Sequence, residues 1–352
     1  MTEPNDMSES DSSEEVKLPM ALFAVEPKSN KRLLFDMSTR KIHGVSSSVF
    51  PNATCVFENG GWFLMVQHKP PDFKEQAVFL VHQSTGGRLD LPAFGSSSNG
   101  IFVFYVDSHG APLVVACVKT RTSFAPTVHV ACPGDVCWSV YKHGVDADPP
   151  PCSASRAAQR RRQRRLLEPA SIVDVALVGT QAICLDANGE ILVFDVTEMT
   201  WRRRTPAVRP DSGFEQYARS LVAADGEVLL VSRPRTMENA FRFFKLDVEA
   251  LEWSPLERRK LDDTSWFLSK GQSFRARDAG KRRVYTFRVE GAGACTLGLG
   301  MSLKCITNVY AYDLDDGSVE MVIPASIVTE ARRWVRPCVC AAPATSHDPV
   351  VY

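Results

Sequence analysis

The stretch ILVFDVTEMTWRRR, residues 191–204, decides the fold. Four apolar residues end at Asp195, a short polar turn follows, and Trp201 opens a second extended segment. Runs of β-branched and aromatic residues on either side of a polar turn are typical of a β-hairpin. The stretch therefore predicts two antiparallel strands joined by a tight turn after Asp195.

The same pattern returns along the chain at a nearly constant spacing. The segment FFKLDVEALEWSPL, residues 243–256, contains Asp247 and Trp253, and each lies 52 residues after its counterpart in the first stretch. Weaker copies occur at residues 33–45 and 309–324. Self-similarity with a period of about 50 residues is the mark of a protein built from repeated β-sheet blades.

We expect six hairpin endings, near residues 36, 82, 131, 195, 247 and 313. The two longest gaps between them each contain an insertion, at residues 145–169 and 291–304. A helical apolar period is not sustained outside residues 154–167 and a weaker stretch at 324–334. The sequence therefore predicts an all-β fold, a β-propeller of six blades with about four antiparallel strands each, whose ring closure removes exposed strand edges.

The bulk composition sets the boundaries of this domain. Residues 1–17 are rich in Ser, Asp and Glu, so we expect a disordered acidic tail, followed by the propeller at 18–340 and a second disordered tail at 341–352. Lys plus Arg and Asp plus Glu both number 41, so any charge signal must be local. The N-terminus has no apolar signal region, and no run of 18 apolar residues suggests a membrane span.

Cysteine and histidine usage gives no metal motif. The ten cysteines contain no CxxC pair, so we expect reduced thiols in a cytoplasmic or nuclear protein. The seven histidines are spread singly, and no HExxH, GxSxG or phosphate-binding loop is present. The glycine-rich segment 291–300 has no helix after it, so we interpret it as a flexible insert. We therefore assign no catalytic residue, no cofactor and no metal, although a Ser/His/Asp triad that forms only in space stays open.

The recurring Asp and Trp residues have a structural explanation. Asp195, Asp247 and Asp313 each close an apolar strand, where a short carboxylate can accept hydrogen bonds from backbone N–H groups two residues on. Catalytic carboxylates would have to converge on one site instead of recurring once per blade. Trp201 and Trp253 follow the same logic, so we expect them to pack between blades, while an exposed ring could serve an interface.

An arginine-rich segment within the insertion at 145–169 is the strongest local anomaly. It follows three prolines, which cannot continue a strand, so it is predicted to loop out of the propeller. Three interpretations stay open: a solvated loop, a nuclear-import signal, and direct contact with RNA or DNA. The candidate import residues are Arg160, Arg161, Arg162, Arg164 and Arg165.

Two further basic triplets follow the repeated tryptophans. If each hairpin joins the third and fourth strands of a blade, both triplets lie near the crossing to the next blade and toward the same rim. They would then form a basic patch suited to an acidic protein surface or a phosphate backbone, with ordinary surface charge as the alternative. The candidate patch residues are Arg202, Arg203, Arg204, Arg258, Arg259 and Lys260.

Several segments in order resemble the plant KIB-type β-propeller family, whose domain is often found behind an F-box. The resemblance covers roughly residues 18–338 and rests on LPMALF, GGWFLM, FLVHQSTGGRLDLP, YARSLVAADGEVLLVSRP, SWFLSKGQSF and RRWVRP, among others. It implies a propeller that recognises a protein partner. F-box members carry helical residues before the propeller, whereas this chain has an acidic tail there, so a Skp-type adaptor is not an expected partner.

We therefore expect a non-catalytic protein-interaction module that resembles the substrate-recognition domain of plant F-box proteins but lacks the F-box. It should need no cofactor, bind no membrane and reside in the cytoplasm or nucleus. Two alternatives stay open. One is a hydrolase-like propeller enzyme with its site at the central channel, and the other is nucleic-acid binding through the arginine-rich insertion.

Overall fold

The computed structural model describes the regular part of the chain. The described residues are 20–24, 31–37, 39–46, 53–68, 75–82, 84–95, 100–119, 126–143, 172–186, 189–204, 217–234, 240–257, 261, 263–269, 271–278, 281–290, 306–322 and 330–335. Within these ranges every regular element is a β-strand. The predicted all-β fold is confirmed.

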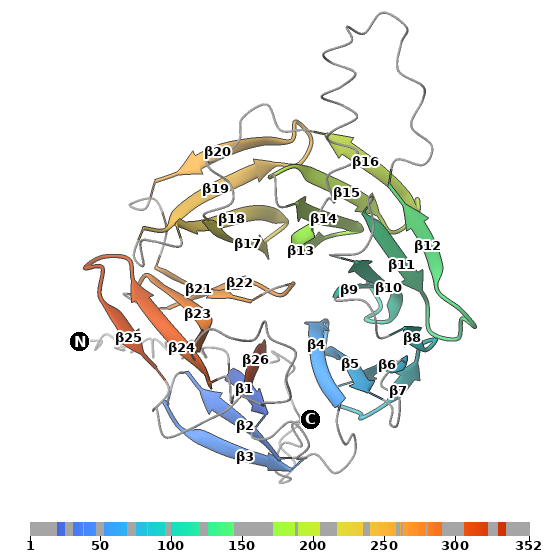
Figure 1. The fold of residues 1–352 in the computed structure, drawn as a ribbon, viewed down its shortest axis with the longest axis horizontal. Helices are drawn as coiled ribbons and strands as arrows, with labels where there is room; N and C mark the ends of the chain where they lie inside the picture. The colour runs from blue at the N-terminus through green and yellow to red at the C-terminus, as the bar shows by residue number, and fades with distance from the viewer. Residues whose placement is uncertain are drawn as a thin grey trace, which may run out of the picture.

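The described strands form six hydrogen-bonded sheets, arranged around a common axis as a β-propeller (Figure 1). Sheet one contains β26 (Glu330–Val335), β1 (Met20–Ala24), β2 (Lys31–Asp36) and β3 (Ile42–Ser46). Sheet two contains β4 (Ala53–Asn59), β5 (Trp62–His68), β6 (Glu75–His82) and β7 (Arg88–Asp90), with β8 (Phe94–Gly95) beside β6. Sheet three contains β9 (Gly100–Val106), β10 (Pro112–Lys119), β11 (Thr127–Ala131) and β12 (Ser139–Lys142).

The second half of the chain forms the other three sheets. Sheet four contains β13 (Ile172–Val178), β14 (Gln181–Asp186), β15 (Ile191–Asp195) and β16 (Thr200–Arg204). Sheet five contains β17 (Tyr217–Ala224), β18 (Glu227–Pro234), β19 (Arg242–Asp247) and β20 (Glu252–Leu256). Sheet six contains β22 (Phe274–Arg277), β21 (Thr264–Leu268), β23 (Arg283–Glu290), β24 (Ile306–Asp313) and β25 (Val319–Met321).

Sheet six departs from the predicted antiparallel pattern. Its innermost strand is β22, and β21 lies between β22 and β23. The β21–β23 pair is parallel, with Trp266 opposite Val284 and Leu268 opposite Thr286. The expectation of about four antiparallel strands is therefore wrong for this sheet. The sheet has a fifth strand, and β21 forms a hairpin with the innermost strand β22 while it pairs in parallel with β23.

The ring closes between the two ends of the described chain. The C-terminal strand β26 pairs with the N-terminal strand β1, with Met20 opposite Val335 and Ala24 opposite Glu330. Sheet one therefore combines strands from both ends of the chain, and its innermost strand comes last in the sequence. The weak helical expectation at residues 324–334 is wrong over its second half, which is the start of β26.

The strand order separates the connections into two faces. In the antiparallel sheets, tight turns such as Gly60–Gly61 and Asp225–Gly226 join the first and second strands, and the Asp195 hairpin joins the third and fourth. We call their side the turn face. The opposite strand ends are joined by longer segments such as 143–171, 205–216 and 291–305. We call that side the long-connection face.

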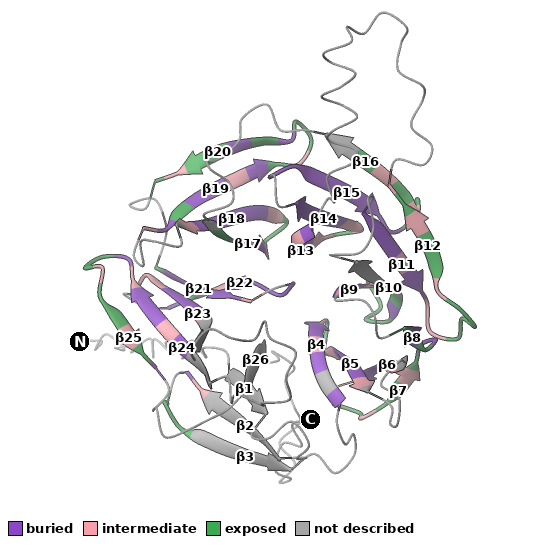
Figure 2. Cartoon of the chain, in the orientation of Figure 1, coloured by how far each residue is buried: buried purple, intermediate pink, exposed green. Residues whose placement is uncertain are grey.

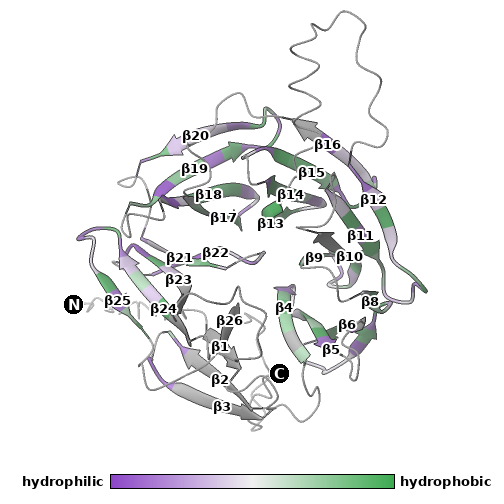
Figure 3. Ribbon diagram, in the orientation of Figure 1, coloured by the Kyte–Doolittle hydropathy of each residue, from purple (hydrophilic) through white to green (hydrophobic). Residues whose placement is uncertain are grey.

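Apolar residues fill the spaces between neighbouring sheets. Strand β15 is buried at all five positions, which explains the four consecutive apolar residues at 191–194 (Figures 2 and 3). One apolar cluster joins sheets two, three and four, a second joins sheets four and five, and a third joins sheets five and six. Among sheets two to six the described core is therefore a series of layers between neighbouring sheets.

Candidate interaction site

The repeated aspartates hold the hairpin turns, as the sequence predicts. Asp195 Oδ1 accepts hydrogen bonds from the N–H groups of Thr197 at 3.0 Å and Glu198 at 3.1 Å. Asp247 and Asp313 each accept equivalent bonds from the second and third residues that follow them. These carboxylates belong to the turn face and are used by the backbone, so the prediction of a structural role is confirmed.

These turns share a second feature, a residue with positive φ, which the sequence pattern did not predict. In five sheets the fourth residue after the strand that precedes the outermost strand has a positive φ, whichever residue type occupies it. A non-glycine residue in this region is strained unless the turn holds it in place. The residues are Arg40, Gly86, Met199, Leu251 and Gly317, with φ of 56°, 66°, 53°, 54° and 73°.

The pKa of Asp195 reports how strongly its turn is held. Burial raises this pKa, but the hydrogen bonds from Thr197 and Glu198 and the charge of Arg202 outweigh burial and hold the pKa below its ordinary value. The folded pKa is therefore lower than the unfolded one, near 3.9. The ionised carboxylate stabilises the fold above that pH, and its contribution is lost as the pH falls through the folded pKa.

We expect Asp195→Asn to lower the free energy of unfolding by about 1–2 kcal/mol at pH 7, because a charged acceptor for two backbone N–H groups is replaced by a neutral one. The difference from the wild type should shrink as the pH falls below about 4, because the carboxylate is protonated first in the unfolded chain and then, through its lower folded pKa, in the native protein. Urea denaturation at pH 7 and at successively lower pH measures it. A difference that does not change with pH would contradict the assignment.

The repeated tryptophans lie between sheets. Trp201 Nε1 donates a hydrogen bond to the carbonyl oxygen of Tyr141 in sheet three, at 3.2 Å. Trp253 is 4% exposed and belongs to the apolar cluster shared by sheets four and five. The prediction that both pack between blades is confirmed.

Two more tryptophans make the same kind of bond without sharing the Asp–Trp spacing. Trp138 Nε1 donates to the carbonyl of Pro92 at 2.9 Å, and Trp62 Nε1 donates to the carbonyl of Gly110 at 2.7 Å. Both bonds join sheets two and three. Sequence spacing missed Trp62 because it lies in the second strand of its sheet, whereas the repeated tryptophans lie in the fourth.

The first basic triplet lies inside a strand. Arg202, Arg203 and Arg204 belong to the outermost strand β16 and do not form the crossing after it. Arg202 is exposed, and β16 ends toward the long-connection face. The second triplet, Arg258, Arg259 and Lys260, follows β20, which ends toward the same face, but these three residues lie outside the described residues. The shared basic patch therefore stays a prediction.

Other predicted segments also fall outside the described residues. These are the tails 1–17 and 341–352, the insertion at 145–169 and the glycine-rich segment 291–300. The import or nucleic-acid role of the arginine tract stays a prediction. Its residues Arg160, Arg161, Arg162, Arg164 and Arg165 lie in the connection from β12 to β13, two strands whose joined ends open on the long-connection face.

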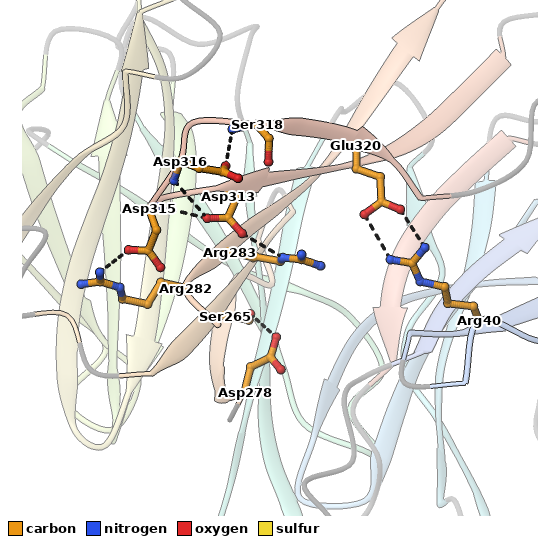
Figure 4. Close-up of polar contacts among 10 residues, drawn as sticks. All are labelled: Arg40, Ser265, Asp278, Arg282, Arg283, Asp313, Asp315, Asp316, Ser318 and Glu320. Carbon is orange, nitrogen blue, oxygen red and sulfur yellow. Dashed lines mark hydrogen bonds and ion pairs between the residues drawn. The ribbon is translucent and has the colours of Figure 1, made fainter. Parts of the chain in front are cut away.

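A polar network joins sheet six to sheet one on the turn face (Figure 4). Arg40, in the β2–β3 turn, binds both carboxylate oxygens of Glu320 on β25, at 2.7 and 3.1 Å. This bond lowers the pKa of Glu320 below its ordinary value. In sheet six, Arg283 contacts Asp313 at 3.3 Å, and Arg282 pairs with Asp315. The carboxylates of Glu320, Asp313 and Asp315 are therefore paired with arginines that stabilise turns or join neighbouring sheets.

A buried aspartate that the sequence did not single out lies at the ring centre. Asp174 on β13 is 1% exposed, and its carboxylate accepts hydrogen bonds from the N–H groups of Val175, Leu221 and Gly271, at 2.9, 2.8 and 2.7 Å. The last two belong to sheets five and six. The available signal was a charged residue within the apolar run IVDVALV.

The described residues give no support for a metal centre. No group of three or more His, Cys, Asp or Glu side chains among them could hold a metal ion. No helix in the same part of the chain is long and apolar enough to cross a membrane. Absence of catalysis and of cofactors stays an expectation from the sequence.

The fold and its inter-sheet contacts define the chain as a β-propeller protein. Residues 34–285 match the family model described as KIB1-4 beta-propeller. The match spans more than half of the chain, so the protein belongs to the KIB1-4 beta-propeller family, and the resemblance noted in the sequence is confirmed.

Comparisons with curated proteins and with solved structures give no further family assignment. No curated protein matches the chain. Among solved structures, the chain is similar to the crystal structure of the Cps50 (Swd1) β-propeller domain of Myceliophteria thermophila, with 9% sequence identity and a TM-score of 0.42. The similarity covers 86% of this chain and 88% of that one. At this TM-score it supports no argument about function.

Proposed function

We propose that each of the six sheets is one propeller blade and that the protein is a non-catalytic module that binds a protein partner through its long-connection face. The observation that carries this proposal is the unequal distribution of connections. The three longest connections, 143–171, 205–216 and 291–305, all join strands on one face, whereas tight turns held by Asp195 and its counterparts lie on the other. Binding residues on a repeat scaffold usually lie on loops held by a rigid framework.

The contacts between sheets supply that rigid framework. Tryptophan N–H groups bind carbonyls of neighbouring sheets, and the Arg40–Glu320 pair joins sheets one and six. A scaffold whose strand ends keep fixed positions lowers the ordering cost of the loops it carries, because their end points need not be brought together on binding. Family membership supports a propeller in this role, since the resemblance implies recognition of a protein partner.

The charge of the long-connection face suggests the character of the partner. The exposed Arg202 is the middle residue of β16, which ends at this face. The arginine tract lies in the connection between β12 and β13, whose joined ends lie at this face, and the second triplet follows the end of β20 there. Cationic groups gathered on one face of a neutral protein favour a partner with an acidic surface and increase its association rate at low salt.

Reversal of the basic triplet should weaken partner capture. We expect replacement of Arg202, Arg203 and Arg204 by Glu to reduce the yield of a stoichiometric partner from native-tissue extract at least about tenfold, with a stronger effect at low salt. A matched control replaces two exposed lysines of the turn face, Lys41 and Lys281, by Glu. Equal capture by the wild type and the triplet variant, with both folded by circular dichroism, would refute the proposal.

A further inference from the structure

The β21–β22 hairpin of sheet six points into the centre of the ring (Figure 1). The described residues of the connection at its tip, Ser269 and 271–273, are held together by one side chain: Ser273 Oγ donates to the carbonyl of Ser269 at 2.8 Å and accepts from its N–H at 3.0 Å. Gln272 N–H also donates to the Ser269 carbonyl, at 3.2 Å. The tip is therefore a compact turn with its own hydrogen bonds.

The tip is bound to sheets four and five by one carboxylate. Asp174 on β13 accepts the N–H of Gly271 at 2.7 Å and the N–H of Leu221 on β17 at 2.8 Å. Ser273 also forms an isolated parallel bridge with Val222 on β17. Because a carboxylate is a charged acceptor, each of these backbone bonds is stronger than a neutral one.

The tip also reaches across to sheet three. A Cβ atom built on Gly271 would lie 2.5 Å from Cγ2 of Ile101, which is on β9, the innermost strand of that sheet. Ile101 and Asp174 lie near the starts of their strands, where both strands leave the long-connection face. The hairpin from sheet six therefore touches sheets three, four and five at this end of the ring centre.

One buried side chain of the tip lacks hydrogen-bond partners among the described residues. Gln272 is 3% exposed, and its amide nitrogen and oxygen have no hydrogen-bond partner among the described residues. A buried polar group without a partner costs about 1–3 kcal/mol. The hydrogen bond from Gly271 to Asp174 stabilises the tip in the ring centre, whereas burial of the unpaired Gln272 amide destabilises it there. The net free energy that holds the tip in place is therefore smaller than its contacts alone would suggest.

We propose that the tip of the β21–β22 hairpin is a plug, which occupies the ring centre at the long-connection face and leaves this position while the six sheets stay folded. Departure of the tip would expose the Gln272 amide to water and uncover Ile101 and the Asp174 carboxylate at that end of the ring. This movement governs access to the ring centre from that face and does not depend on which partner the protein binds.

A pair of glycine variants separates the plug contact from backbone strain. Gly271 and Gly226 have nearly equal φ, 78° and 76°, but a Cβ at Gly226 meets nothing within 4 Å. Both changes to Ala impose similar backbone strain, whereas Gly271→Ala also forces the tip away from Ile101. We expect Gly271→Ala to accelerate amide hydrogen exchange in the segment 264–277 about tenfold or more, with Gly226→Ala leaving that segment unchanged.

Two further variants complete the test. Ile101→Ala in the Gly271→Ala background should restore much of the lost protection, because it removes the atom that the new Cβ meets. Asp174→Asn should accelerate exchange of Gly271 and Leu221 while sheet two keeps its protection. Equal exchange in the two glycine variants, or a failure of Ile101→Ala to restore protection, would overturn the plug. Loss of exchange protection in sheet two together with the tip would also overturn the plug, because the tip would then leave only when the whole ring unfolds.

Discussion

A chain that ends after Val322 is expected to lose cooperative unfolding. This truncation removes β26, the innermost strand of sheet one, so β1 loses one of its two partner strands from Met20 to Ala24 and keeps only β2. The ring would open between sheets one and two and between sheets one and six, because β26 contacts both β4 and β24. The expected cost is on the order of 5 kcal/mol or more, which is comparable to the whole stability of a typical domain.

A chain that ends after Pro337 is the matched control, because it lacks residues 338–352 but keeps β26 intact. Urea denaturation followed by tryptophan fluorescence compares the midpoints and slopes of the two chains. We expect the control to match the full chain and the shorter chain to show a broad transition or none. Identical midpoints for all three would mean that β26 does not close the ring.

The repeat spacing made the fold predictable. Asp195 and Asp247 mark equivalent positions because a tight turn between antiparallel strands needs the same local chemistry in every sheet. All six predicted hairpin endings coincide with the end of a strand: β2, β6, β11, β15, β19 and β24. Local turn chemistry and strand periodicity depend on neighbouring residues in the sequence, so they can be inferred without knowing the contacts between distant parts of the chain.

The contacts at the ring centre could not be predicted in this way. Asp174 and Gly271 are 97 residues apart, and nothing in their local sequences links a buried carboxylate in one sheet to a glycine in another. The extra strand β21 was equally hidden, because its segment SWFLSKGQSF is also consistent with an ordinary hairpin. Such features arise from ring geometry, which brings the innermost strands together whatever their separation in sequence.

The two repeated tryptophans should differ sharply in their contribution to stability. Trp253 is 4% exposed and lies in the cluster that includes Ile183 and Val193 of the neighbouring sheet, whereas Trp201 is only half-buried. We expect Trp253→Ala to lower the free energy of unfolding by about 3–5 kcal/mol, because it leaves a large cavity between sheets four and five. Trp201→Ala should cost about half as much, since part of its ring already contacts water.

Phenylalanine variants separate packing from hydrogen bonding at the two sites. Trp253 Nε1 has no hydrogen-bond partner among the described residues, so Trp253→Phe loses packing volume but no hydrogen bond. Trp201→Phe loses the bond to the Tyr141 carbonyl and should cost about 1 kcal/mol for that bond alone. Urea midpoints of the four variants measure these differences. Equal losses for the two alanine variants would show that the layer between sheets four and five is not the stronger inter-sheet contact that its burial indicates.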